Sequence, residues 1–468
     1  MVPSEPPQDD DDTTAAAPRC DVPPDGRTVG LIQCDPRSEP GYTLFAPVLS
    51  DTTWLIDETG QIVHSWTFPG GPGLSVYLLP SGNLLHTSAH GLDESLPAPG
   101  NQGGHVEEVT WDGEKVRGFT YAGPGYEGHH DVEPLPDGNV LLVAWERRSA
   151  QEAIAQGRDP GPESISEHGM WFDHIVEVDP AGEIVWTWRL FDHLVQDLDP
   201  GLPHYGDPAA FPGRLDVNAP GSPGYAGPGV DWNHMNAVSY DAERDEIVLT
   251  VLTQGEVWII DHGTTTAEAA SSEGGPRGHG GDFLYRWGNP RVWGHGETPR
   301  VLNGQHDGHI IPPGLPGAGN LLVFNDEAVF DTASAAIEIE LPRDDDGAYV
   351  LDEDAVYGPE APSWSFLGDD AAPLYAAFMG GAQRLPGGNT LICEGGPGRV
   401  IEVTPDGDMV WEYVNPDVDG VRLRQGDDVG RTGAFDPRAA IYRAVRIPRD
   451  HPGLEGRDLS PQGSIERP

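Results

Sequence analysis

The chain repeats a short sequence unit, and this repetition constrains its fold more than any other feature. The unit is an apolar strand, a Pro-x-Gly-Asn turn and a second apolar strand, as in YLLPSGNLLHT from Tyr77 and EPLPDGNVLLVAWE from Glu133. Longer or variant copies begin at Ile310 and at Gln383. Proline fixes φ at the turn, and glycine and asparagine accept positive φ. Each copy therefore predicts a β-hairpin.

A second unit follows many of these hairpins. It is a strand, an Asp/Pro/Gly turn and a strand that ends in an aromatic residue, as in WLIDETGQIVHSWTF from Trp54 and VIEVTPDGDMVWEYVNP from Val400. In the copy that contains EIVWTW, Ile184, Trp186 and Trp188 alternate with other residues and so share one face of a strand. Two consecutive hairpins make one four-stranded sheet.

Sheets of this size that recur every 50–70 residues or so are typical of a β-propeller. The sequence therefore predicts an all-β fold, a six-bladed β-propeller with long Gly/Pro-rich loops. The first strands of the blades are expected near these residues: Tyr42, Val76, Asp131, Asn236, Ile310 and Ala382. The late segment IYRAVRIP, from Ile441, is expected to pair with the early segment YTLFAP and close the ring. The segment from Arg147 is at most a short helix or loop.

Composition sets the expected domain boundaries. Residues 1–40 are predicted to be a disordered acidic tail, residues 41–448 the propeller, and residues 449–468 a polar C-terminal tail. Cys20 and Cys34 flank a turn-rich stretch and could close a disulfide, whereas Cys393 lies in an apolar strand and is expected to be a buried free thiol. Disulfides form in oxidising compartments.

No hydrophobic signal core is present, so the chain is either cytosolic or has lost its signal. The cysteine pattern favours an extracellular or periplasmic protein. The six tryptophans of the strand units are expected to pack between blades. They are Trp54, Trp66, Trp186, Trp188, Trp258 and Trp411.

The charge of the chain narrows the choice of partners. Lys and Arg number 27 against 76 Asp and Glu, which gives a net charge of −49. Such a charge repels nucleic-acid phosphates and anionic lipids. No apolar run reaches the roughly 18–20 residues that span a bilayer. We expect a small-molecule substrate, no nucleic acid and no membrane insertion, and the oligomeric state stays open.

The acidity has two interpretations, a hydrated surface or a cation-binding protein. The acidic runs Asp344–Asp346 and Asp9–Asp12 likewise read as solvated surface or as weak calcium sites, and neither matches the EF-hand pattern.

Three histidines occupy one register position. When blades are aligned on Leu135, Ser239 and Ile311, the residues five positions earlier are His130, His234 and His306. The first strand of a propeller blade lines the central channel, so these imidazoles are expected to converge near the axis. Alternatively, each histidine only caps a strand.

Converging imidazoles could bind an anion such as sulfate, act as nucleophile or general acid and base, or ligate a metal such as Zn²⁺ or Cu²⁺. His129 and His309 lie at odd offsets from the three and are expected on the opposite strand face.

Several ordered motifs carry a family resemblance. DWNHMNAVSYDAERDEIVL, FLYRWGNP, LNGQHDGHIIPPGLPGAGNLLVFND and GGAQRLPGGNTLICEGGPGRVIEVTPDGDMVWEYVNP resemble the bacterial arylsulfotransferase family, from about Gly41 to Arg446. The resemblance implies a six-bladed propeller, an exported protein, and transfer of sulfate between phenols without a nucleotide donor. It also implies that one channel histidine is transiently sulfated while others and an arginine hold the sulfate. The N-H-M-N and Q-H-D motifs match two histidine positions of the family, His234 and His306.

The chain also departs from the family pattern, as a diverged member would. Phe378 stands near the place where relatives carry the histidine that is expected to be sulfated, and Leu252 stands where an arginine is common. Asp326 and Glu327 add negative charge beside the expected sulfate site.

Three functions follow from this site. The first is an arylsulfotransferase-like transferase with His130, His234 and His306 as catalytic residues and no cofactor. Asp131, Asp307 and Arg384 would then surround the substrate. The second is an enzyme in which the same three histidines bind a divalent metal (Zn²⁺, Cu²⁺ or Ca²⁺). The third is a propeller that binds without catalysis.

Overall fold

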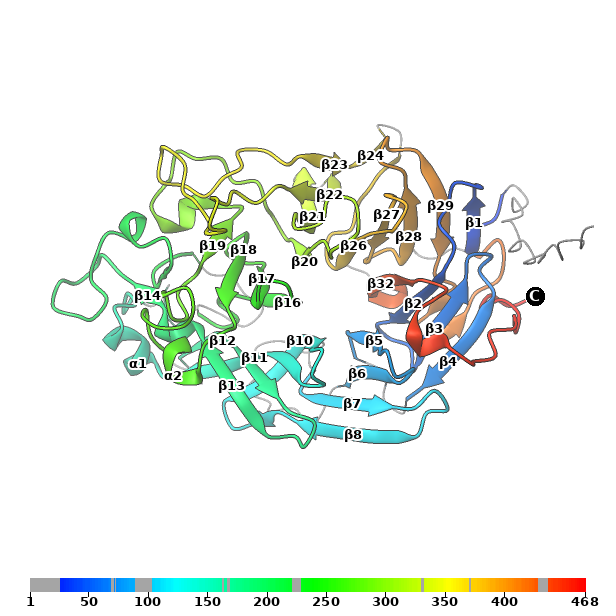
Figure 1. Cartoon of the computed structure of the whole chain (residues 1–468), viewed down its shortest axis with the longest axis horizontal. Helices are drawn as coiled ribbons and strands as arrows, with labels where there is room; N and C mark the ends of the chain where they lie inside the picture. The colour runs from blue at the N-terminus through cyan, green and yellow to red at the C-terminus, as the bar shows by residue number, and fades with distance from the viewer. Residues whose placement is uncertain are drawn as a thin grey trace, which may run out of the picture.

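The strands of the protein form six antiparallel sheets around one axis. The computed structural model describes residues 26–68, 71, 73–88, 103–161, 164–165, 169–220, 229–329, 332–369, 372–427 and 437–468. Each sheet has four or five strands, and the sheets follow one another around the ring (Figure 1). The predicted all-β fold and the six-bladed propeller are confirmed.

Each blade runs from an innermost strand to the rim. Blade 1 contains β32 (Ile441–Ile447), β2 (Tyr42–Pro47), β3 (Thr52–Asp57) and β4 (Ile62–Thr67). Blade 2 contains β5 (Val76–Leu78), β6 (Leu84–Ser88), β7 (His105–Val109) and β8 (Lys115–Thr120). Blade 3 contains β10 (Tyr126–Pro134), β11 (Val140–Arg148), β12 (Met170–Val178) and β13 (Ile184–Arg189), and the short strand β9 (Ala122–Gly123) pairs with β10.

The second half of the ring repeats this order. Blade 4 contains β16 (Met235–Asp241), β17 (Glu246–Val251), β18 (Glu256–Asp261) and β19 (Tyr285–Trp287). Blade 5 contains β20 (His306–Ile310), β21 (Leu321–Val329), β22 (Ala333–Ile339) and β23 (Trp364–Phe366). Blade 6 contains β26 (Gly380–Arg384), β27 (Thr390–Glu394), β28 (Arg399–Val403), β29 (Met409–Val414) and β1 (Gly30–Cys34).

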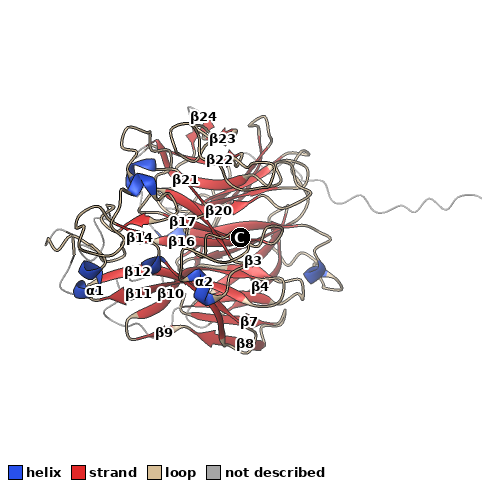
Figure 2. Ribbon diagram, turned by 60° about the vertical axis from the view of Figure 1, so that its left-hand side comes forward, coloured by secondary structure: helices blue, strands red, loops and turns tan. Residues whose placement is uncertain are grey.

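The remaining elements are short and lie in the connecting loops (Figure 2). Three small two-stranded pairs are β14 (Leu194–Val195) with β15 (Leu215–Asp216), β24 (Gly368–Asp369) with β25 (Ala372–Pro373), and β30 (Asp417–Val418) with β31 (Val421–Arg422). The α-helices are α1 (Ala150–Ala155), in the segment predicted as a short helix or loop, and α2 (Thr266–Ala269). The 3₁₀ turns are Leu190–Asp192, Pro208–Ala210, Pro290–Trp293, Pro437–Ala439 and Pro452–Leu454. Within the described ranges, no helix is long and apolar enough to cross a membrane.

Both ends of the chain close the ring. The predicted pairing of the late strand with the early one is confirmed, because Tyr42 pairs with Ile447 and Leu44 with Val445. The innermost strand of blade 1 is thus β32, whereas the strand that begins at Tyr42 is second. At the other end, β1 pairs with β29 on the rim of blade 6.

The propeller extends beyond the boundaries expected from composition. Gly30–Cys34 lies in the range predicted as a tail, yet it forms β1. Beyond residue 448, Ser464 bridges to Gln61, and the Ile465 side chain is 1% exposed. Both segments are short and pair with strands far away in the chain, so local composition does not reveal them. Cys20 of the predicted Cys20–Cys34 disulfide lies outside the described residues. Cys393 is free and buried, as expected.

A separate hydrophobic cluster fills each of the six interfaces between neighbouring blades. Sheets stacked face to face bury the residues that alternate along each strand. The six tryptophans predicted to pack between blades are all buried, at most 4% exposed. These interfaces hold the inner strands, and therefore the channel side chains, in fixed positions.

An ionic contact beside the β16–β17 turn also joins blades 3 and 4. His262, directly after β18, has Nδ1 2.6 Å from Asp245 Oδ1 and Nε2 3.2 Å from Glu177 Oε2. Both ring nitrogens face carboxylates, so both donate when the ring is an imidazolium. Burial lowers the pKa of His262, but Glu177 and Asp245 outweigh burial and raise it overall.

We expect this contact to make stability depend on pH. Because the pKa of His262 is higher in the folded protein than in the unfolded chain, protonation of His262 stabilises the fold. This contribution is complete below pH 6.5, the pKa in the unfolded chain, and is lost as pH rises through the pKa of the folded protein. The pKa of Glu177 is lowered despite its burial, so its contribution is present above 4.5 and lost at lower pH. Between pH 4.5 and pH 6.5, the His262→Gln variant should therefore lose about 1 kcal/mol of unfolding free energy. The loss is no larger because Asp245 is partly exposed and solvent screens its charge. Urea denaturation from pH 5 to pH 9 measures the difference, and an equal loss at every pH would contradict it.

Candidate functional site

The structure brings the three register-matched histidines together. His130 lies on β10, His234 directly precedes β16, and His306 begins β20, and each of these three strands is the innermost of its blade. The rings of His130 and His234 have centroids 4.6 Å apart, and His306 is close enough to act on the pKa of His130. The three residues are 3%, 7% and 4% exposed.

Strained backbone at one level of three blades presents these side chains. His130 and His234 have φ of 53° and 52°, and Asp307, directly after His306, has φ of 57°. At each place the pairing register between the first and second strands shifts, as in a β-bulge. A left-handed conformation costs an L-residue roughly 1–2 kcal/mol, so such strain recurs where a site requires it.

His234 is paired with a buried carboxylate. Its Nδ1 donates to Asp231 Oδ2, and Asp231 Oδ1 accepts a hydrogen bond from Trp145 Nε1 at 3.1 Å. Burial lowers the pKa of His234, but Asp231 outweighs burial and raises it overall. The reverse holds for Asp231, whose pKa is lowered by His234 in spite of burial. The pair therefore favours an imidazolium at His234.

His306 has a carboxylate partner of a different character. Its Nδ1 lies against Asp326 Oδ2 and 2.9 Å from the Gly304 carbonyl oxygen. The other oxygen, Oδ1 of Asp326, is buried without a hydrogen-bond partner among the described residues. Burial raises the pKa of Asp326 to about 6. With Nδ1–H donated to Asp326, the lone pair of a neutral His306 is on Nε2.

His130 is backed by a second histidine. The Nδ1 atoms of His130 and His129 are 2.7 Å apart, and His129 Nε2 is 3.1 Å from Asp173 Oδ1. The His129 ring stacks on Trp145 at 3.9 Å between centroids. Strand alternation predicted His129 on the opposite face from His130, but the bulge between Gly128 and Val132 interrupts that alternation.

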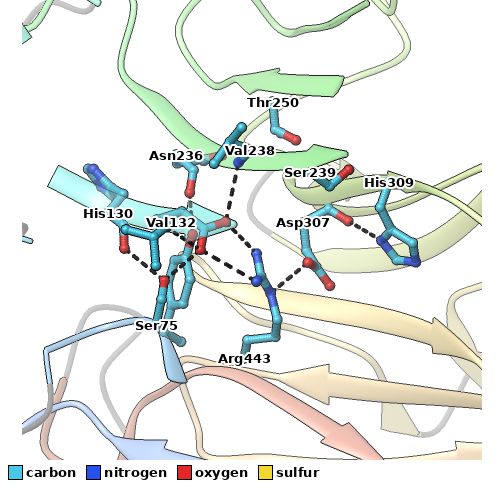
Figure 3. Close-up of polar contacts among 12 residues, drawn as sticks. Ser75, His130, Val132, Asn236, Val238, Ser239, Thr250, Asp307, His309 and Arg443 are labelled. Atoms are coloured by element: carbon cyan, nitrogen blue, oxygen red, sulfur yellow. Dashed lines mark hydrogen bonds and ion pairs between the residues drawn. The ribbon is translucent and has the colours of Figure 1, made fainter. Parts of the chain in front are cut away.

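The predicted substrate residues Asp131 and Asp307 lie on the axis with an arginine that the sequence analysis did not select. Arg443 Nη2 is 2.8 Å from Asp131 Oδ2, and Arg443 Nε is 2.6 Å from Asp307 Oδ1 (Figure 3). Asp131 also accepts hydrogen bonds from Ser75 Oγ at 2.6 Å and Tyr77 OH at 3.1 Å. Both carboxylates are thus bound to protein groups.

Arg384, the third predicted substrate residue, is not brought to the histidines. Its guanidinium donates to Glu338 Oε2 at 2.6 Å and to Thr390 Oγ1 at 3.1 Å, and it lies over the Trp364 ring. It is the last residue of β26, whereas His234 directly precedes β16, His306 begins β20, and His130 lies at the bulge within β10. Four residues along a strand span about 13 Å, which explains the separation.

The departures from the family pattern have structural counterparts. Leu252 N–H donates to the carbonyl oxygen of His234, so this leucine lies beside that histidine. Phe378 lies two residues before β26, the innermost strand of blade 6. Asp326, read from sequence as an unfavourable charge, is the partner of His306.

Sequence reasoning missed the carboxylates Asp231 and Asp173. The Asp-x-x-His spacing of DWNH was a signal for Asp231, whereas Asp173 lies 44 residues from His129 with no local signal.

The alternative metal centre requires at least three ligands around one ion. In the part of the chain that the structure describes, no group of three or more His, Cys, Asp or Glu side chains is arranged to hold a metal. The Asp344–Asp346 run forms an exposed turn, in which Asp344 accepts two backbone hydrogen bonds. Asp9–Asp12 lie outside the described residues.

Comparisons with known proteins agree on a family. The sequence profile of the family described as Arylsulfotransferase (ASST) matches residues 104–400, more than half of the chain. Arylsulfate sulfotransferase AssT from Escherichia coli O6:H1 is 32% identical over 167 residues, and the enzyme of the same name from Lelliottia amnigena is 29% identical over 167 residues. Each match covers 32% of this chain and 24% of the relative, so the chain matches only about a quarter of these curated proteins.

Among solved structures, a protein of unknown function from Bacteroides caccae has a TM-score of 0.46 at 14% identity over 87% of this chain and 99% of its own. The Swd1 β-propeller domain from Myceliophteria thermophila has a TM-score of 0.40 at 12% identity over 85% of this chain and 91% of its own. The family profile matches more than half of the chain, and its range includes all three channel histidines, so it decides the assignment: the chain belongs to the arylsulfotransferase family.

Proposed function

We propose that the protein transfers a sulfuryl group from an aryl sulfate to a phenol through its channel histidines. The observation that carries this proposal is the pair of neighbouring His–Asp contacts. His234 with Asp231 favours an imidazolium, while His306 with Asp326 presents a lone pair on Nε2. A site of this kind offers both an acid and a nucleophile to one substrate.

The donor half-reaction begins with attack by His306. Its Nε2 forms a bond to sulfur as the bond from sulfur to the aryl oxygen breaks, and Asp326 stabilises the positive charge that develops on the ring. His234 donates its Nε2 proton to the departing phenolate oxygen. His306 then carries the sulfuryl group, which makes it the substitute for the histidine that Phe378 replaces.

The acceptor half-reaction reverses these bonds with a second phenol. The phenol gives its proton to His130 Nε2, and its oxygen bonds to sulfur as the N–S bond breaks. His306 is regenerated, and the proton on His130 returns to His234, whose ring lies 4.6 Å away. Atoms and charges balance over the cycle.

Incubation with 4-nitrophenyl sulfate tests this function. We expect release of nitrophenol that depends on a phenol acceptor and, without acceptor, a sulfuryl adduct on the peptide that contains His306. The His306→Ala variant should form no adduct, while the His262→Gln variant, altered in the ionic contact between blades 3 and 4, should react as the natural protein does. Wild-type protein that neither releases nitrophenol nor forms an adduct between pH 5 and pH 9 would refute the proposal.

A further inference from the structure

We infer that His129 and Asp173 form a proton relay behind His130, so that a proton taken by His130 is passed to a buried carboxylate. The catalytic use of this relay rests on the proposed function, but the hydrogen-bonded chain itself does not. His129 and Asp173 act through His130 and are therefore positioning and proton-transfer residues.

The geometry links the three groups in a continuous line. His130 Nδ1 meets His129 Nδ1 at 2.7 Å, and His129 Nε2 meets Asp173 Oδ1 at 3.1 Å. The second oxygen, Asp173 Oδ2, accepts a hydrogen bond from Met235 N at 2.7 Å. Met235 is the first residue of β16 and directly follows His234, so the start of β16 holds Asp173 in place beside His234.

Two nitrogens at 2.7 Å must share one proton, and this requirement defines two states. In the first, Asp173 is ionised, His129 donates Nε2–H to it, His130 donates Nδ1–H to His129, and His130 Nε2 has a lone pair. In the second, Asp173 carries a proton on Oδ1, His129 carries its proton on Nδ1, and His130 carries its proton on Nε2. The second state has one proton more, which entered at His130 Nε2, and both imidazoles are neutral in both states.

The surroundings of His130 explain why such a relay is useful. His234 acts on it from blade 4 and His306 from blade 5, and the side chains around His129 behind it are Asp231, Asp173 and His174. Burial, followed by His234, His129 and His306, lowers the pKa of His130 well below its usual value. A second imidazolium beside His234 is therefore unfavourable.

The far end of the relay is suited to hold the proton. Burial and the neighbouring Asp231 raise the pKa of Asp173 well above that of an ordinary aspartate. Burial lowers the pKa of His129 to about 3, so His129 passes a proton on and does not keep one. The chain thus lets His130 accept a proton with no net positive charge on either ring.

The Asp173→Asn variant tests whether the hydrogen-bonded relay exists, and this test needs no substrate. Because the side-chain oxygen is needed to accept from Met235 N, the new amide must direct its NH₂ toward His129 Nε2. This orientation fixes His129 as the Nδ1–H tautomer and His130 as the Nε2–H tautomer. Histidine ¹⁵N chemical shifts report these tautomers.

We expect His130 of the natural protein to change tautomer as pH is lowered without becoming an imidazolium. In Asp173→Asn, we expect it to remain Nε2–H at every pH. A natural protein in which His130 titrates to an imidazolium, or a variant in which His130 Nε2 keeps its lone pair, would overturn the relay.

Kinetics test the use of the relay. In Asp173→Asn and in His129→Phe, which keeps a ring stacked on Trp145, we expect the donor half-reaction to change by less than about 3-fold. We expect desulfation by weakly acidic phenols to slow about 100-fold, the usual contribution of a general base. Acceptors acidic enough to bind as phenolates need no base and should react nearly as fast as with the natural protein.

His174→Gln is the matched control, because His174 is a buried histidine next to Asp173 that is not part of the proton relay. This variant should leave both half-reactions unchanged. Equal slowing of both half-reactions in the relay variants would indicate a structural defect and overturn the catalytic role. If the natural protein does not react with aryl sulfates at all, the proposed function fails, but the tautomer measurement still decides whether the relay exists.

Discussion

The Asp326→Asn substitution is expected to lower kcat for sulfuryl transfer by about 100- to 10,000-fold, while KM for the aryl sulfate stays within a few-fold. Asp326 accepts Nδ1–H of His306 and so keeps the lone pair on Nε2. An asparagine can turn its NH₂ toward Nδ1, which moves the ring proton to Nε2 and removes the nucleophile. The neutral amide also cannot stabilise the cationic N–S intermediate. Steady-state kinetics and adduct formation measure the effect.

The neighbouring Glu327→Gln substitution is a matched control for Asp326→Asn. It removes an adjacent carboxylate that binds Asn303 and not His306, and we expect activity within about 3-fold of the natural protein. If Asp326→Asn retained more than about a tenth of the natural kcat, His306 could not be the nucleophile in the form proposed here.

The same pairs predict a bell-shaped pH profile for kcat. As pH falls, Asp326 gains a proton and no longer accepts Nδ1–H of His306, and the pKa of Asp326, raised to about 6 by burial, places this acid limb near pH 6. As pH rises, His234 loses the proton that the leaving group requires. Because Asp231 overcomes burial and raises the pKa of His234, the basic limb lies above 6.5.

The blades were predictable because each is written in local sequence. Pro-x-Gly-Asn turns and alternating apolar residues define a hairpin without reference to the rest of the chain. The convergence of His130, His234 and His306 was also predictable, since one register position along equivalent strands corresponds to one level of the channel. Strands β1 and β32 differ in how well the sequence predicts them. The longer apolar segment of β32 indicated a strand, while the five residues of β1 did not.

The partners of the histidines were not predictable for a physical reason. Asp326 lies 20 residues after His306 on the neighbouring strand β21, and its position in the sequence did not reveal its contact with the imidazole. Asp173 lies 44 residues from His129, on β12, so that contact depends on how the strands of the blade pack. The alternation rule failed at His129, because the left-handed backbone at His130 breaks the period of two on which the rule depends. Arg384 lies at the end of β26, where it binds Glu338 and Thr390, so its distance along the strand keeps it from the histidines.

Loss of the axial arginine is expected to be the most damaging change to stability. Arg443 on β32 binds Asp131 of blade 3 and Asp307 of blade 5. Asp131 also accepts from Ser75 of the segment that leads into β5 and from Val238 N of blade 4, and Asp307 accepts from Ala382 N of blade 6. This single polar cluster, drawn in part in Figure 3, therefore joins all six blades across the axis.

We expect Arg443→Met to lower the free energy of unfolding by about 3–5 kcal/mol, because it leaves two buried carboxylates without their counter-charge. Urea denaturation followed by tryptophan fluorescence measures this loss. Burial already raises the pKa of Asp307 although Arg443 acts to lower it, so removal of Arg443 raises that pKa further. A carboxylate whose pKa is higher in the folded protein than in the unfolded chain destabilises the fold most when it is ionised. The loss of unfolding free energy in Arg443→Met should therefore become smaller as pH falls toward 4 and Asp307 is protonated.

The single variant leaves the Asp131 and Asp307 carboxylates without a counter-charge. The triple variant Arg443→Met, Asp131→Asn, Asp307→Asn removes these two negative charges as well. It should therefore recover most of the lost stability at pH 7 and lose the pH dependence, while keeping hydrogen bonds to the strands around the axis. A single variant that is destabilised by less than about 1 kcal/mol, or a triple variant no more stable than the single one, would show that the ion pairs do not hold the axis together. In that event the hydrophobic clusters between the blades would be sufficient to keep the channel histidines in position.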